Sequence, residues 1–220
     1  MGSHPKNWSR VVQLGSWCAC LCMLLAGSSE AFYYPLQETQ IREAYLLGRS
    51  GDPQKVSALL EPYIRRFPLM PVAAHVESIE FRTPYEQVIL RASERSNDYD
   101  LDQAEKDYAL QPDLVLVRVL IYSPLSHSGS IAHSSAEQSK ASATDDNWLG
   151  FHFQISQERP IESKKMRAQA VRAGRYDKGT RKEVLMEFDA NQFGPGPAKI
   201  LVTTPNGQAV TAEFNLDELK

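Results

Sequence analysis

Residues 114–122 read LVLVRVLIY, and this stretch decides the fold of the chain. Every position in it is apolar or aromatic except Arg118. Successive side chains of a β-strand point to opposite faces, so a run that is apolar at both odd and even positions predicts a strand covered on both sides. We therefore expect a β-sheet with this segment at its centre.

Two shorter segments downstream show the alternation that is typical of half-buried strands. In residues 150–156 the apolar side chains fall at odd positions, and in residues 183–188 they fall at even positions. Each segment therefore predicts a strand with one face toward the core. The side chains that we expect to face the core are Phe151, Phe153, Ile155, Val184, Met186 and Phe188.

The last residues of the sequence predict a β-hairpin. Two apolar runs, residues 198–204 and 208–216, flank Asn206-Gly207. That dipeptide is the one preferred in two-residue type I′ turns, because both central positions of such a turn need a positive φ. The side chains expected to share the core face of the second strand are Val210, Ala212, Phe214 and Leu216.

About five short strands separated by turn signals are typical of a small antiparallel β-sandwich, immunoglobulin-like in general character. No signature Cys or Trp supports the immunoglobulin label itself. We assign residues 112–220 to this β-rich domain. Within it, residues 124–147 are rich in Ser and Ala and nearly lack large apolar side chains. Such a segment buries too little surface to offset the entropy of ordering, so we expect a flexible loop there and favour disorder over a functional role.

Helical patterns precede the strands. Residues 37–48 and 54–67 each place apolar side chains on one face, the second with Ile64 and Phe67 near its end. The intervening Gly51-Asp52-Pro53 combines a helix stop with an N-cap and a first-turn proline. These signals predict a helical hairpin that needs a further element to pack against.

Residues 73–82 look extended, and two further helices are expected after them. The third helix begins at Thr83-Pro84, and the fourth runs from about Asp100 to Leu110. Residues 32–111 are therefore expected to be mainly helical. Helices first and antiparallel strands afterwards define the expected fold class, α+β.

The first residues have the pattern of a secretory signal peptide. Lys6 and Arg10 precede a short apolar run at 11–27, and small residues follow at Ser29 and Ala31. Cleavage after Ala31 is expected, which would remove all three cysteines, because Cys18, Cys20 and Cys22 lie within the apolar run. The alternative is an uncleaved N-terminal membrane anchor, for which the run is just long enough.

Composition excludes several classes of protein. The chain has 220 residues with a formal net charge of -3, and 42% of its residues are hydrophobic. These values are ordinary for a folded soluble protein and argue against a disordered polyelectrolyte, a multi-span membrane protein and a nucleic-acid binder. We expect no transmembrane segment in the mature chain.

Positive charge is concentrated in one place. Residues 164–182 hold eight basic residues and a single acid, Asp177. Such a segment could recognise an acidic protein, an anionic polysaccharide or a membrane surface. It could equally be a solvated edge strand whose lysines discourage pairing, or it could face the acidic residues 94–107. The candidate binding residues are Lys164, Lys165, Arg167, Arg172, Arg175, Lys178, Arg181 and Lys182.

No motif predicts a catalytic residue, a metal site or a cofactor. Asp98, Asp100 and Asp102 imitate the start of a calcium loop, but Gln103 replaces its turn glycine and Ala109 its bidentate glutamate. The histidines lack zinc-site spacing, and no serine-nucleophile, P-loop or dinucleotide-binding motif occurs. The three aspartates are better interpreted as the acidic first turn of a helix. The histidines without zinc-site spacing are His75, His127, His133 and His152.

Two resemblances are present. Residues 44–68 resemble one tetratricopeptide unit and residues 104–112 the second helix of another, but Pro68 and Pro112 lie 44 positions apart, and fewer than three repeats would not bury a solenoid core. The order of elements, from signal peptide through an Arg42-Glu43-Ala44-Tyr45 helix to a terminal hairpin, is similar to uncharacterised exported bacterial proteins. That resemblance implies export and implies no activity.

The sequence thus predicts an exported protein of the cell envelope, periplasmic or secreted, that acts as a non-catalytic binding or structural module. The alternative is a small periplasmic or secreted hydrolase whose site lies at the junction of the helices and the sheet.

Overall fold

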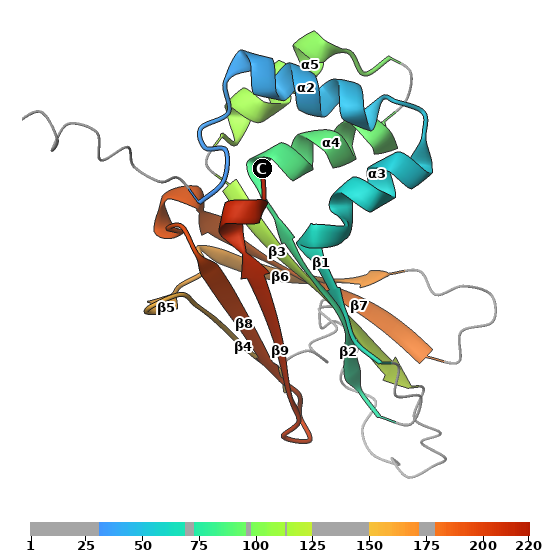
Figure 1. The fold of residues 1–220 in the computed structure, drawn as a ribbon. Coiled ribbons are helices and arrows are strands. Elements are labelled where there is room, and N and C mark those ends of the chain that lie inside the picture. Colours follow the sequence, from blue (N-terminus) through green and yellow to red (C-terminus); the bar gives the residue numbers. More distant parts are fainter. Residues whose placement is uncertain (1–30, 69–72, 96–97, 113, 125–149, 172–178) are drawn as a thin grey trace, which may run out of the picture.

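The structure is a computed structural model that describes residues 31–68, 73–95, 98–112, 114–124, 150–171 and 179–220. The described part is an α+β protein, as the sequence predicts. Figure 1 shows its helices gathered over one end of two β-sheets. The expected signal peptide and most of the expected flexible loop at 124–147 lie outside the described residues.

The described residues contain four α-helices: α2 (Glu38–Gly48), α3 (Pro53–Leu60), α4 (Pro84–Glu94) and α5 (Leu101–Leu110). Their starts follow the predicted caps. The side chains of Asp52, Thr83 and Asp100 each accept backbone N–H groups of the first turn, which are otherwise unpaired. Helix α2 packs mainly against α4 and α5.

The contact between α2 and α4 is close because small residues line it. Ala44 of α2 and Ala92 of α4 are fully buried. A Cβ atom at Gly48 would lie 2.7 Å from the Cβ of Ala92 and would also collide with the carbonyl oxygen of Ile89. The two helices could not approach this closely with any other residue at position 48.

The larger sheet has five antiparallel strands in the order β1-β2-β3-β7-β6. The predicted central position of residues 114–122 is confirmed, since β3 lies between β2 and β7. The strands are β1 (Ile64–Arg66), β2 (His75–Arg82), β3 (Leu114–Pro124), β6 (Lys165–Val171) and β7 (Gly179–Asp189).

The smaller sheet has four antiparallel strands in the order β5-β4-β8-β9. The predicted alternation along β4 is confirmed, because Phe151 and Ile155 are buried while His152 and Gln154 are exposed. The terminal hairpin is confirmed as well. Its strands are β8 (Pro197–Thr203) and β9 (Ala209–Asn215), and β4 (His152–Ser156) and β5 (Pro160–Ile161) complete the sheet.

One hydrophobic core is shared by both sheets and by the helices. Phe81 of β2 lies at its centre, with its ring centroid 5.1 Å from Phe193 and 5.7 Å from Phe214 of β9. Phe32, near the start of the described residues, packs against Phe81 with 6.3 Å between the ring centroids. These rings connect elements that are far apart in sequence, so both sheets and the helices share this core. A small second cluster is formed by Ala92, Tyr99 and Ala104.

Two local predictions are wrong. The helix expected over 54–67 ends at Leu60, and after a 3-10 turn (Glu61–Tyr63) residues 64–66 pair with β2 as strand β1. Pro62 lies at the changeover, where it cannot donate the N–H that a continuing helix needs.

The turn of the terminal hairpin also differs from the expected two-residue type I′ turn. Its loop spans residues 204–208, and the N–H of Gly207 donates to the carbonyl of Thr204. Pro205 and Asn206 are therefore the central residues, and proline fixes a negative φ that a type I′ turn cannot use. Gly207 takes the positive φ, at 81°.

Candidate functional site

The structure divides the predicted basic segment between two neighbouring strands. Lys164 directly precedes β6, the last strand of the larger sheet, and Lys165 and Arg167 lie on it. Arg181 and Lys182 lie on β7. Arg172, Arg175 and Lys178 are outside the described residues.

The cations of β6 differ in how far they are neutralised. The Lys164 ammonium contacts the Asp189 carboxylate, and the Arg167 guanidinium lies 3.7 Å from the Glu187 carboxylate. Lys165 is exposed and makes no ion pair with any described residue. Exposed pairs of this kind are weak, so Lys165 and Arg167 still present positive charge to solvent.

The cations of β7 are tied into the sheet. The Arg181 guanidinium donates to both carboxylate oxygens of Glu77 on β2, at 2.8 and 3.1 Å, and lies 5.8 Å from the ring centroid of Tyr122. Lys182 is only 4% exposed. These two residues therefore contribute less to a basic surface than their position in the sequence suggests.

Ion pairs continue across the outer face of the larger sheet. Glu80 of β2 accepts from Arg82 at 2.7 Å and from Arg118 of β3 at 3.3 Å, and Arg118 lies 3.0 Å from Glu183 of β7. Burial alone would lower the pKa of Arg118, but the Glu183 and Glu80 carboxylates raise it. A row of paired charges thus crosses this face from β2 to β7, and the cations of β6 lie at the edge of the sheet beyond it.

The two sheets come together along two seams. At the first, which we call the closed seam, the Arg65 guanidinium of β1 donates to the Glu213 carbonyl of β9 at 3.0 Å and lies 4.8 Å from the ring centroid of Phe214. Nearby, the Tyr63 hydroxyl accepts the backbone N–H of Lys220 at 2.9 Å. This seam is bridged by direct hydrogen bonds.

The second seam, which we call the open seam, lies between β4 and β5 of one sheet and β6 and β7 of the other. A cavity of about 400 Å³ opens there. Its lining is mixed, because Gln154, Glu162 and Ser163 line it together with apolar side chains. Among the apolar ones, Phe153, Ile161 and Met166 are only half-buried. The apolar side chains that define the open seam are Phe153, Ile155, Ile161, Met166, Met186 and Phe188.

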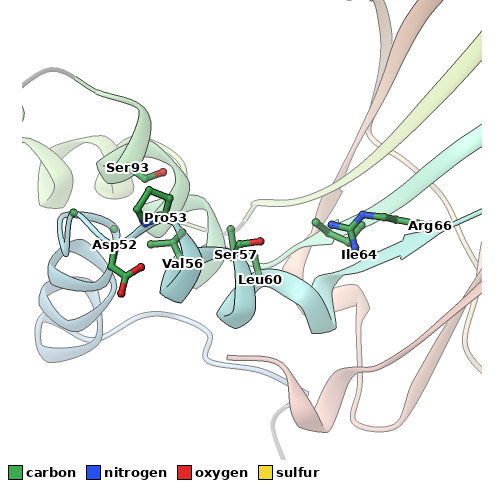
Figure 2. Close-up of a pocket in the computed structure, with 10 residues that line it drawn as sticks. Asp52, Pro53, Val56, Ser57, Leu60, Ile64, Arg66 and Ser93 are labelled. Carbon is green, nitrogen blue, oxygen red and sulfur yellow. The ribbon is translucent and has the colours of Figure 1, made fainter.

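A second cavity, of about 390 Å³, lies at the junction of the helices and the larger sheet. Figure 2 shows its lining from α3, β1 and the end of α4. Its polar groups are largely engaged. Asp52 caps α3, and the Arg66 guanidinium pairs with Glu61 at 2.6 Å. Ser57 and Ser93 line the same cavity, and neither of the two histidines that the structure describes does.

A buried acid lies close to this junction. Glu86 of α4 is fully buried, and neither of its carboxyl oxygens has a hydrogen-bond partner among the described residues. Burial raises the pKa of Glu86 well above its ordinary value, and the negative charge of Glu80 raises it further, while Arg82 acts in the opposite direction. Burial therefore favours the neutral, protonated form of this carboxyl group over its charged form.

The described histidines are placed apart from both cavities. His75 is buried, with its Nδ1 2.9 Å from the Ala73 carbonyl and its ring 5.1 Å from that of Tyr122. His152 is exposed on β4. Among the residues that the structure describes, no group of His, Cys, Asp or Glu is arranged to hold a metal ion. Within the same residues, no helix has the length and apolar character needed to cross a membrane.

Comparison with known protein families finds no match, and neither does comparison with curated proteins. The candidate sites therefore have to be judged on their own chemistry.

Two features of these sites were not predicted from the sequence. Ile161 and Met166 lie at the open seam but carry no motif, and only the order of strands places them together. Glu86 sits on what the helical pattern would assign to a polar face. The other residues of α4 from Pro84 to Ile89 are buried as well, so the burial of Glu86 follows from the packing of the whole start of this helix.

Proposed function

We propose that this protein is a non-catalytic binding module of the cell envelope, and that it recognises an acidic partner through the exposed cations of β6. One observation carries the proposal. Lys165 and Arg167 lie on an edge strand, exposed on its outer face, and Met166 between them lines the open seam with its half-buried apolar side chains. Edge strands, charge and a nearby apolar surface are the elements from which protein interaction sites are commonly built.

Export is part of the same proposal, and its support is the signal pattern over residues 1–31 together with the resemblance to exported bacterial proteins. The mature chain would then begin at Phe32, in the periplasm or outside the cell. The intact mass of the protein recovered from fractionated cells tests this. A soluble species of residues 32–220 is expected, and a full-length species in the membrane fraction would instead indicate the N-terminal anchor.

The finer fold belongs to the proposal too. We infer that the two sheets form a small β-sandwich that is open on one side, with α2 and α3 as the helical hairpin ahead of it. The support is the core that residues of both sheets share. Protection of backbone amides in β3 and β8 against hydrogen exchange, lost in one transition, is the expected behaviour of such a unit.

Binding can be tested with three probes of defined chemistry: a polyglutamate peptide, the anionic polysaccharide dextran sulfate, and phosphatidylglycerol vesicles. At least one is expected to bind, and the double variant Lys165→Glu, Arg167→Glu should weaken its binding by about tenfold or more, because two attractive charges become repulsive. Lys199→Glu is the matched control, since it changes an exposed lysine on a strand of the other sheet.

Two results would refute the binding proposal. One is that none of the three probes binds at low salt. The other is that Lys199→Glu weakens binding as strongly as the β6 variants do, which would show a general response to net charge.

The hydrolase alternative is favoured by one observation, the cavity at the helix–sheet junction with Ser57 and Ser93 in its lining. If the protein is a hydrolase of this kind, Ser57→Ala or Ser93→Ala should abolish turnover of ester or glycoside test substrates without changing the unfolding free energy by more than about 0.5 kcal/mol. Absence of turnover in the unchanged protein would leave the binding module as the better proposal.

A further inference from the structure

We infer that the acidic partner binds as an extended segment of another protein, which adds a strand to the edge of β6 that no described strand occupies. This inference rests on the proposed function and specifies the form of the partner. Its side chains would alternate, acidic on the outer face of the sheet and apolar on the face toward the open seam.

Strand β6 is hydrogen-bonded to a neighbouring strand along one edge. It has seven residues and pairs with β7 from Lys165↔Glu187 to Val171↔Arg181. It is the last strand in its sheet, and no described strand pairs with its other edge. Half of its backbone N–H and C=O groups therefore point away from the sheet, which is the arrangement that an added strand completes.

The two faces of β6 differ in chemistry. On the outer face Lys165, Arg167 and Gln169 are exposed. On the inner face Met166 and Ala168 are half-buried and belong to the margin of the core. An adjacent strand would place alternate side chains next to these two sets, so acidic residues suit one face and apolar residues the other.

The apolar side chains of the added strand would enter the open seam. The open seam begins at Met166 and continues to Ile161 on β5. Its cavity of about 400 Å³ can take a few aliphatic side chains, whose burial would remove the half-exposed surface of both residues from water.

Other occupants fit less well. A membrane or a polysaccharide would engage the cations alone and would leave the backbone edge and the open seam unused. A second copy of this chain, paired edge to edge through β6, would add two more cations and no acid to the outer face of the extended sheet, so it would leave Lys165 and Arg167 without opposite charges across the new contact. Charge complementarity therefore favours an acidic strand from a different protein.

The test uses seven-residue peptides with blocked ends, matched to the length of β6. One peptide alternates Glu and Val, and the control has the same composition with all Glu residues first. The alternating peptide should bind about tenfold more tightly, because only it presents both chemistries in register. Two N-methylated forms of the alternating peptide extend the test, one methylated at its odd-numbered residues and the other at its even-numbered residues. An added strand donates hydrogen bonds to β6 from one of its edges only, so one form should lose binding and the other should keep it.

A protein variant separates the seam from the charge. Ile161→Ser should weaken the alternating peptide about fivefold while leaving polyglutamate binding unchanged, because it removes apolar surface only. Val56→Ser, in the cavity at the helix–sheet junction, is the matched control and should change neither.

The outcomes distinguish this inference from the function it rests on. If both peptides bind equally, and both lose affinity in Lys165→Glu, the acidic partner stands and strand addition is wrong. Strand addition is also wrong if neither set of N-methyl groups matters. If binding is indifferent to Lys165, the proposed function itself fails.

Discussion

At the closed seam, the Arg65 guanidinium and the Phe214 ring join β1 to β9, and the side chains there are buried or hydrogen-bonded. At the open seam, Ile161 and Met166 remain half-exposed around a cavity, and the adjoining strand carries exposed cations. The same two sheets form both seams. One seam therefore contributes to the stability of the core, and the other is the place where the proposed contact with a partner would form.

The largest effect that would test this comparison comes from the aromatic residues of the two seams. Phe214→Ala should lower the free energy of unfolding by about 3–5 kcal/mol, because it opens a cavity in a fully buried core. Phe153→Ala at the open seam should cost about 1 kcal/mol, since that ring is already half-exposed. Urea unfolding monitored by tryptophan or tyrosine fluorescence measures both. Equal losses would contradict the division of roles.

The second prediction concerns Glu86, which is buried among neighbours of the closed seam. Because its pKa in the folded protein is raised above the ordinary value of 4.5, its contribution to stability is full below that pH and is lost as pH rises. The wild-type protein should therefore lose stability as the pH rises above about 4.5, and the Glu86→Gln variant should lose less stability over the same change in pH. Glu86→Met should raise the unfolding free energy at neutral pH by about 1–3 kcal/mol, because no unpaired polar group is then buried.

Thermal melts across this pH range provide the measurement. Glu162→Gln is the control, since it changes an exposed carboxylate at the open seam and should leave the pH dependence of wild type intact. A wild-type protein whose stability does not fall with rising pH would show that Glu86 finds a partner in solution.

The smallest effects should come from the arginines. Arg65→Ala should cost about 1–2 kcal/mol, because it removes a hydrogen bond to the Glu213 carbonyl and a cation–π contact. Arg167→Ala on β6 should cost less than about 0.5 kcal/mol, since its ion pair is exposed. Urea midpoints with unchanged slopes would report these differences. A larger loss for Arg167 would mean that β6 is a structural edge rather than a binding edge.

Much of the fold could be predicted from the sequence because its signals are local. The apolar run at 114–122 and the caps Asp52, Thr83 and Asp100 depend only on neighbouring residues. Strand β1 was missed because Ile64 suits a helix face as well as a strand. Its pairing with Glu80 of β2, sixteen positions away, decides between them.

The candidate site was harder to predict because its parts are brought together only by the fold. The partner of Arg181 is Glu77, 104 positions away, so no local reading of charge could show that this cation is neutralised. The open seam depends on which strands end their sheets, and that order carries no signature at Ile161 or Met166. Burial of Glu86 likewise depends on elements that come before α4 in the sequence.

The close packing of α2 on α4 has a consequence for tracing the ancestry of this protein. Because Gly48 faces Ala92 and the Ile89 carbonyl with no room for a Cβ, substitution there would separate the two helices. A glycine at this position, with a small residue one turn earlier at Ala44 and another at Ala92, therefore forms a fingerprint imposed by shape. Distant descendants of the same ancestor could keep these three positions after the rest of the sequence has diverged beyond recognition.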